Sequence, residues 1–161
     1  MAYVNNLARI GDWIEREQVQ LYNRTGATLN HGDVVAVDIL MSATESTSVA
    51  PGGATSGWAN AIPMATANIA RILACVIDES GKGVADNELG NLFVHGVGDV
   101  EMDGNTTLDA GEKLVGTNGE TYLSEWATGG YVVGILLEDA EATPGTKLAY
   151  FNGFAMFSED T

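Results

Sequence analysis

A short phrase that occurs twice constrains this chain more than any other feature of its sequence. Residues 28–35 and residues 107–114 both read Thr-Leu-x-x-Gly-acid-x-apolar, and residues 145–148 repeat the Gly-x-Lys-Leu of the second copy. Glycine permits a positive φ in a tight turn, and the apolar residues that follow favour a strand. The phrase therefore predicts a recurring turn-and-strand unit.

A longer parallel connects the segments that follow each copy. Residues 74–79 and then 92–96 resemble residues 135–139 and then 148–153, because each pair runs apolar strand, acidic turn, apolar strand, glycine. The spacings within the two pairs differ. We therefore expect a repeated strand–turn–strand arrangement with loops of unequal length, and not the fixed period of a solenoid.

Alternating or dense apolar residues predict short strands between glycine-rich turns. They fall at residues 18–22, 34–39, 72–77, 92–97, 98–102, 114–115, 122–123, 131–137, 147–151 and 154–157. The alanine-rich residues 65–70 are also compatible with a helix. The pattern predicts an all-β fold, a small β-barrel or sandwich of short antiparallel strands.

The N-terminal residues have a different pattern from the rest of the chain. Leu7, Ile10 and Ile14 recur at helical spacing beside Trp13, and Gly11 limits any helix to a short one. This segment either frays, packs on its own domain, or docks its apolar side on a neighbouring subunit, since exposed Trp and Ile side chains need a partner.

The length of 161 residues is that of one domain with an arm. We expect an extended or short-helical N-terminal arm at residues 1–16 and a single β domain at residues 17–161. A long loop rich in Ser, Thr, Ala and Gly occupies about residues 42–60, with Trp58 as its one large side chain. Loops of this length in compact domains are usually functional or mobile.

Charge excludes several classes of partner. Seven Lys and Arg residues stand against 22 Asp and Glu residues, which gives a formal net charge of −15. Nucleic acids and anionic membranes both attract clustered cations, so neither is an expected partner. The spread of acidic residues favours a soluble, self-repelling surface or one that meets a basic partner.

The single cysteine and the N-terminal residues indicate the cellular compartment in which the protein is made. Cys75 lies in an apolar run, where a buried, unreactive thiol is expected, and one cysteine cannot form an intrachain disulfide. The first residues lack the pattern of a signal peptide, and no apolar run reaches transmembrane length. These features predict a soluble protein made in a cytoplasm.

The motif closest to a metal site begins at Asp99. Residues 99–104 read like the start of a calcium loop, but Ala110 stands where the loop needs a bidentate Glu. A weak cation site and an acidic turn both remain open. His31 is expected to be solvated in a turn, and His95 to be a satisfied residue within a strand.

No catalytic signature is present. The sequence lacks a nucleophile elbow, a phosphate loop and a dinucleotide fingerprint. We therefore predict no catalytic residues, no cofactor, no metal and no small-molecule substrate. Trp13, Trp58 and Trp126 could line a sugar-binding face.

Taken together, these segments resemble the small decoration, or cement, proteins of tailed-bacteriophage heads. The similarity covers residues 18–157 and consists of turn-and-strand phrases at 28–35, 72–77, 92–97, 108–115, 131–137 and 148–157. This chain departs from the pattern in its long loop at residues 42–60.

The resemblance implies an all-β structural protein of the virion. Such a protein binds the major capsid protein on the outer surface of the expanded head as a homotrimer at three-fold or quasi-three-fold positions, after synthesis in the host cytoplasm. It stabilises the head against internal DNA pressure. The resemblance also implies a capsid or subunit interface that includes Tyr3, Val4, Leu7, Ile10, Trp13 and Ile14, to which we add Trp58.

Two other functions remain open. The first is another β protein of the virion, such as a tail-tube, baseplate or fibre component, which would assemble into rings or filaments. The second is a carbohydrate-binding module, which requires Trp58 and Trp126 to be exposed on one face. Oligomeric state distinguishes these alternatives from a trimeric cement protein.

Overall fold

The computed structural model describes residues 16–38, 60–64, 72–127, 131–154 and 157–158. These residues form ten strands: β1 (Glu17–Asn23), β2 (Val34–Asp38), β3 (Asn60–Ile62), β4 (Leu73–Ile77), β5 (Leu89–Met102), β6 (Lys113–Gly116), β7 (Leu123–Glu125), β8 (Tyr131–Leu136), β9 (Gly145–Asn152) and β10 (Phe157–Ser158). The predicted all-β class is confirmed. Within these residues no helix has the length and apolar character needed to cross a membrane.

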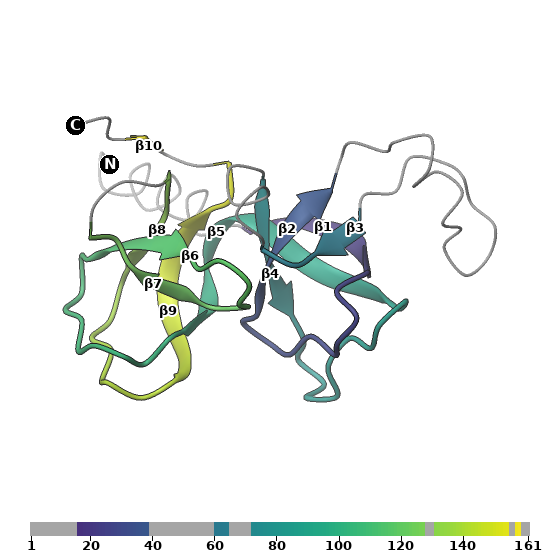
Figure 1. The fold of residues 1–161 in the computed structure, drawn as a ribbon, viewed down its shortest axis with the longest axis horizontal. Helices are drawn as coiled ribbons and strands as arrows, with labels where there is room; N and C mark the ends of the chain where they lie inside the picture. Colours follow the sequence, from purple (N-terminus) through teal and green to yellow (C-terminus); the bar gives the residue numbers. More distant parts are fainter. Residues whose placement is uncertain (1–15, 39–59, 65–71, 128–130, 155–156, 159–161) are drawn as a thin grey trace, which may run out of the picture.

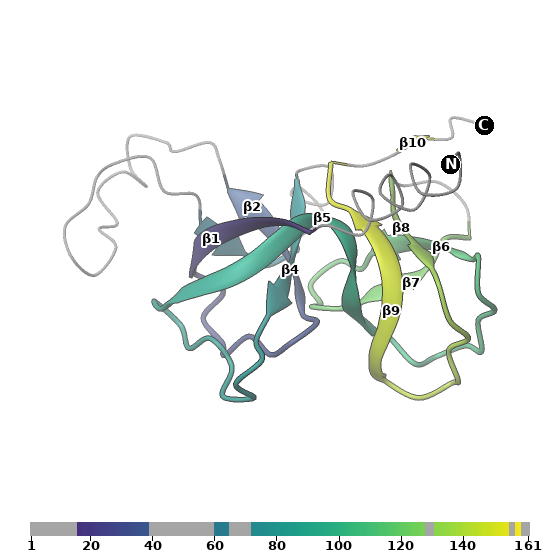
Figure 2. The ribbon, with the colours of Figure 1, turned by 180° about the vertical axis from the view of Figure 1, so that it is seen from behind.

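The sheet closes on itself twice and forms two small barrels, which we call the first ring and the second ring. The first ring runs β1-β3-β2-β4-β5 and closes where β5 pairs with β1. The second ring runs β5-β7-β6-β8-β9 and closes where β9 pairs with β5. Figures 1 and 2 show the two rings side by side, with β5 passing from one to the other. Closure leaves few exposed strand edges.

The two rings are copies of one arrangement. The pairs β2–β3, β2–β4, β4–β5 and β1–β5 are antiparallel, as are their counterparts β6–β7, β6–β8, β8–β9 and β5–β9. The remaining pair is parallel in both rings, β1–β3 in the first and β5–β7 in the second. The repeat seen in the sequence is therefore a repeat of the fold, and two of its pairings are parallel.

The repeated phrase makes the same bonds in both rings. Gly32 N donates to Val76 O at 3.0 Å, and Gly111 N donates to Leu136 O at 2.7 Å. The leucine of each phrase forms an isolated bridge to a later residue of its ring, Leu29 to Val84 and Leu108 to Ala140. Gly32 and Gly111 both have positive φ, 88° and 102°. Glycine is thus required by the turn itself.

Strand β5 belongs to both rings, so the segments predicted at 92–97 and 98–102 form one strand. His95 is the residue where the neighbours of β5 change, because it pairs with Glu17 of β1 on one edge and Asn152 of β9 on the other. Gly153 continues that second edge: its N–H donates to Val94 O at 2.8 Å, and its carbonyl accepts from Leu73 N at 2.9 Å. The end of β9 thereby joins the start of β4.

The core has two parts. The interior of the first ring is filled by small and aliphatic side chains, Leu21, Leu29, Val35, Val37, Ala61, Ala74, Val76, Leu92 and Val94. The larger cluster fills the second ring and the junction, with Val34, Ala36, Met64, Leu73, Cys75, Phe93, Val100, Met102, Leu108, Leu114, Leu123, Val133, Leu136, Ala140, Ala149 and Phe151. Neighbouring residues of β2 and β4 therefore enter different clusters, as alternation along a strand requires.

Several predicted boundaries differ from the structure. Strand β3 begins at Asn60, which the sequence pattern placed in the loop at 42–60, because a three-residue strand carries little periodic signal. The strand predicted at 154–157 was wrong at Phe154, which lies in the turn after β9. Residues 65–70, where the sequence is also compatible with a helix, lie outside the described residues, as do the arm up to residue 15 and residues 39–59 of the loop region.

Candidate functional site

The predicted interface residues cannot be placed. Tyr3, Val4, Leu7, Ile10, Trp13, Ile14 and Trp58 all lie outside the described residues. The groups that the structure does bring together lie at the junction of the two rings and on the outside of the second ring.

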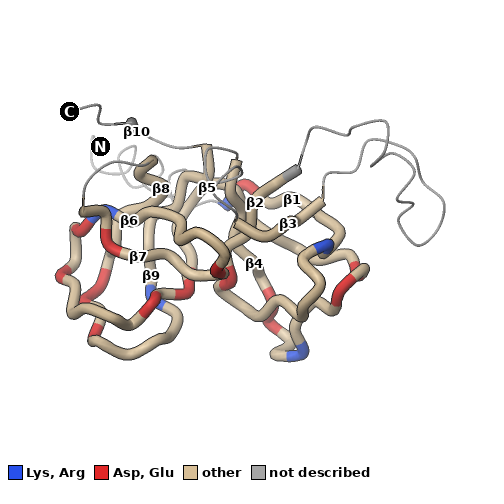
Figure 3. The backbone as a smooth tube through the Cα atoms, in the orientation of Figure 1, with Lys and Arg blue, Asp and Glu red and all other residues tan. Residues whose placement is uncertain are grey.

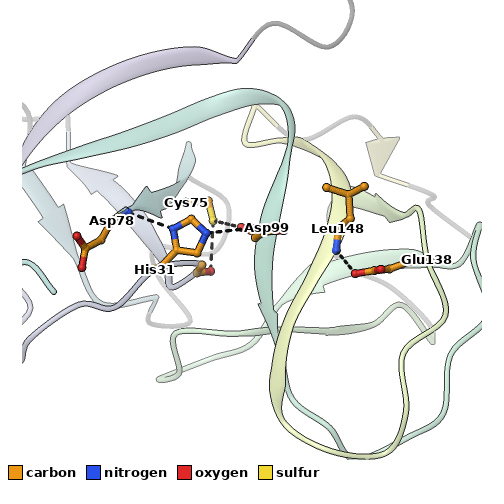
Figure 4. Close-up of polar contacts among 7 residues, drawn as sticks. His31, Cys75, Asp78, Asp99, Glu138 and Leu148 are labelled. Atoms are coloured by element: carbon orange, nitrogen blue, oxygen red, sulfur yellow. Dashed lines mark hydrogen bonds and ion pairs between the residues drawn. The ribbon is translucent and has the colours of Figure 1, made fainter. Parts of the chain in front are cut away.

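His31 connects the turn of the first ring to two other elements. Asp78 N donates to His31 Nδ1 at 3.1 Å, just after β4. Because a backbone N–H can only donate, Nδ1 is the acceptor and Nε2 carries the proton toward Asp99 Oδ2, 3.0 Å away on β5. Figure 4 shows the ring between these two partners. The expectation of a merely solvated histidine was wrong, since both ring nitrogens have partners.

Asp78 is held by its own turn. Its Oδ1 accepts from Ser80 N at 2.9 Å and Ser80 Oγ at 2.6 Å, and its Oδ2 accepts from Gly83 N at 2.5 Å. The Ser80 hydroxyl and then the Gly83 amide lower the pKa of the Asp78 carboxyl. This carboxylate therefore stabilises the turn that positions the N–H facing His31.

Cys75 is buried behind the same turn, as predicted. Its Sγ donates to Gly32 O at 3.2 Å and to Asp99 O at 3.1 Å. Burial, followed by the nearby charge of Asp33, raises the pKa of the thiol well above its usual value. A thiol that stays protonated is a poor nucleophile and a poor metal ligand.

Two further carboxyls lie near this junction. Asp33 is 7% exposed and its Oδ2 accepts from Asn30 N at 2.6 Å. Burial raises the pKa of Asp33, and hydrogen bonds from Asn30 and Thr121 oppose that change. Burial, and then the charge of Asp33, raises the pKa of Glu101. The junction thus disfavours the charged form of both carboxyls.

The segment that begins like a calcium loop divides between strand and turn. Asp99 and Glu101 are part of β5, where Asp99 pairs with His31. Asp103 follows β5, and its Oδ1 accepts from Asn105 N at 3.1 Å in an Asx turn. Among the described residues, no three His, Cys, Asp or Glu side chains converge to hold a metal ion.

An open depression of about 450 Å³ lies beside the junction. It is lined by polar side chains from β1, β5 and the turn after β4, together with one aliphatic residue: Gln18, Ile77, Asp78, Glu79, Ser80 and Asn91. Its two carboxylates give it an acidic rim. Within this lining the Ser80 hydroxyl donates to the Asp78 carboxylate at 2.6 Å, a bond that belongs to the turn after β4, so the depression offers a polar, acidic surface.

Apolar side chains gather on the outside of the second ring, and we call Val115, Ile135, Leu137, Leu148 and Tyr150 the second-ring face. Ile135 lies opposite Tyr150 across β8 and β9, and Leu137 N donates to Leu148 O at 2.9 Å. Directly opposed residues share one face of a sheet. Leu137 is 44% exposed and Leu148 is 38% exposed.

Aromatic groups border the second-ring face. The Tyr150 hydroxyl lies 2.7 Å from His95 Nε2, so His95 has a partner, as predicted. The Lys113 ammonium lies 4.9 Å from the centre of the Trp126 ring. Trp126 itself is partly buried.

Carboxylates dominate the loops of both rings. Figure 3 shows red segments along the loops of both rings, with far fewer blue ones. On the rim of the second-ring face, Glu138 Oε1 accepts from Leu148 N at 2.7 Å, and Asp99 is paired with His31. The face itself consists of uncharged residues.

Sequence reasoning missed two of these features for different reasons. His31 and Asp99 are 68 residues apart, and no local pattern signals their pairing. The second-ring face was readable in principle, because Ile135 and Leu137 alternate with buried Leu136. Dense apolar strands conceal that alternation, since both faces carry aliphatic side chains.

Comparison with models of known protein families gives no match, and comparison with curated proteins gives no significantly similar sequence.

Proposed function

We propose that this chain is a structural protein of a tailed-phage virion that binds the outer surface of the expanded capsid as a homotrimer. The observation that carries the proposal is which side chains are bonded within the protein and which are exposed. His31 and Cys75, which could serve chemistry, are bonded into the junction of the rings. Leu137 and Leu148, which are apolar and suited to contact with a partner, are exposed.

The closed double ring suits a protein that must bear load. Each ring has its edges paired, and β5 ties one ring to the other along a single strand. Pulling the rings apart would break many backbone hydrogen bonds together, rather than separating two domains joined by a linker. A frame of this kind supports the proposed role in resisting internal pressure.

The stabilisation would be thermodynamic. A protein that binds the expanded shell and not its precursor shifts the equilibrium toward the expanded state by its binding free energy. Three linked copies add avidity without new contacts. The net charge of −15 favours a less acidic patch on the shell, so association should slow as salt increases.

The test uses expanded and unexpanded shells of the phage that encodes the chain. The purified protein is incubated with each, the shells are pelleted, and bound protein is quantified at low and high salt. The proposal predicts binding to expanded shells alone and a higher temperature of shell disruption when the protein is bound. Equal binding to both shells, or to neither, contradicts it.

Assembly in solution separates this proposal from its nearest alternative. Light scattering on the purified chain should give the mass of three copies. A ring of six or an open filament would favour a tail or baseplate component instead.

A further inference from the structure

The strongest unassigned feature is the difference between the two outer faces of the repeated ring. In the first ring, the outward side chains of β2, β4 and β5 are Val34, Ala36, Leu73, Cys75 and Phe93. Each is no more than 1% exposed. The corresponding positions in the second ring, given by the matching registers, are Lys113, Val115, Val132, Ile135 and Tyr150.

The cover on the first ring is the second ring itself. A Cβ at Gly116 of β6 would lie 3.1 Å from the Leu73 side chain, so these two elements touch. The Phe93 ring lies against Gly98 of β5 and packs edge-on against Phe151 of β9, with ring centres 5.5 Å apart. In this fold, the outer face of one ring is therefore covered by another ring of the same chain.

The second ring has no described ring on its own outer face. Of the matching positions, Val115, Ile135 and Tyr150 are partly exposed and Val132 is buried, while Leu137 and Leu148 beside them are more exposed. We propose that the second-ring face is a contact surface between copies of this chain, occupied by a second copy. The inference deepens the proposed homotrimer and rests on that part of the proposed function.

Charge favours this location for contact between copies. Copies with a net charge of −15 repel each other, so they can meet closely only where carboxylates are few or already engaged. The five residues of the second-ring face are uncharged, and Lys113, the charged residue among the matching outer positions, is a cation. At the rim, Asp99 is paired with His31 and Glu138 accepts from the Leu148 amide.

The experiment compares the mass in solution of the full chain with that of Leu137→Asp, Leu148→Asp and the double variant, over a series of concentrations. Leu89→Asp is the matched control, because Leu89 is also 44% exposed but begins β5 in the first ring. Leu137→Gln serves as a milder variant, and a thermal melt confirms that each protein is folded.

We expect the Leu137 and Leu148 variants to fall to the mass of one chain, with the double variant falling furthest, while Leu89→Asp keeps the wild-type mass. Unchanged assembly in the double variant overturns the inference. So does a wild-type chain that stays single at every concentration.

Binding to expanded shells, measured separately, distinguishes the two proposals. Assembly that depends on Leu137 without shell binding leaves the contact between copies standing and overturns the proposed function. A single chain that binds shells, and loses this binding in the double variant, overturns the contact between copies and assigns the face to the shell.

Discussion

The first ring and the second ring are built by the same strand pairings, yet only the first has its outer face covered by the other. Cys75 of the first ring and Ile135 of the second occupy matching positions; the first is fully buried and the second is partly exposed. Phe93 and Tyr150 differ in the same way. A repeated backbone therefore does not dictate burial, which depends on what packs against each copy.

The two turns also differ in their surroundings. His31 of the first turn bridges to β5 and to the turn after β4, whereas Ala110 stands at its position in the second turn. A Cβ at Gly32 would lie 2.6 Å from the Thr146 methyl, whereas one at Gly111 would meet nothing within 4 Å. The first turn thus packs on the second ring, and the second turn faces outward.

The largest expected difference between the rings is at their matching aromatic positions. Phe93→Ala should destabilise the protein by about 4 kcal/mol, because it empties a fully buried site between the rings. Tyr150→Ala should cost about 1 kcal/mol, since its ring is only half-buried and mainly a hydrogen bond is lost. Urea unfolding measures both. Similar losses of stability in the two variants would show that Phe93 at the junction is not packed more tightly than Tyr150.

The seam between the rings gives the next effect. Gly153→Ala would place a Cβ 1.8 Å from Leu73 O, so the backbone must shift where β9 meets β4. We expect a loss of about 3 kcal/mol by thermal or urea unfolding. Phe154→Ala, at the neighbouring exposed residue, is the control and should change stability little. A neutral Gly153→Ala would mean that the rings are not tightly joined there.

The two glycines of the repeated phrase sharpen the comparison. Both have positive φ, so alanine at either position should cost about 1 kcal/mol from backbone strain. Gly32→Ala should lose about 1 kcal/mol more than Gly111→Ala, because it must also displace the Thr146 side chain. Urea unfolding of the two variants measures this difference in lost stability. Equal losses would show that the first turn is not packed against Thr146.

The smallest effect is a dependence on pH. Burial raises the pKa of Asp33 in the folded state, so the folded protein binds its proton more tightly than the unfolded chain does. This group therefore favours folding fully below its unfolded pKa, and that contribution is lost as pH rises through the folded pKa. Asp33→Asn should flatten this loss across the weakly acidic range.

The amide introduced by Asp33→Asn would keep an oxygen that can accept from Asn30 N, so the turn should survive the substitution. Glu112→Gln is the control, because Glu112 occupies the same position in the exposed second turn. Stability measured by urea unfolding across pH should respond to Asp33→Asn and not to Glu112→Gln. An equal response of both variants would show that burial at the junction is not the cause.

The sequence predicted the local pieces well where a short-range pattern encodes them. Turns at Gly32 and Gly111 were predicted because positive φ selects glycine, and strand β8 because its aliphatic run has the composition of a buried strand. The very short β3 was missed because three residues carry no period. The continuity of β5 was missed because the alternation on either side of Gly96 and Gly98 looks like two strands separated by a turn.

By itself, the sequence determined the all-β class, the repeat, the acidic surface and a buried Cys75, since each depends on composition or on neighbours within a few residues. Only the tertiary structure decided that the repeats share one strand, that His31 pairs with Asp99, and that one outer face is covered while its counterpart is exposed. These depend on contacts between residues far apart in the chain, and local propensity carries no information about such contacts.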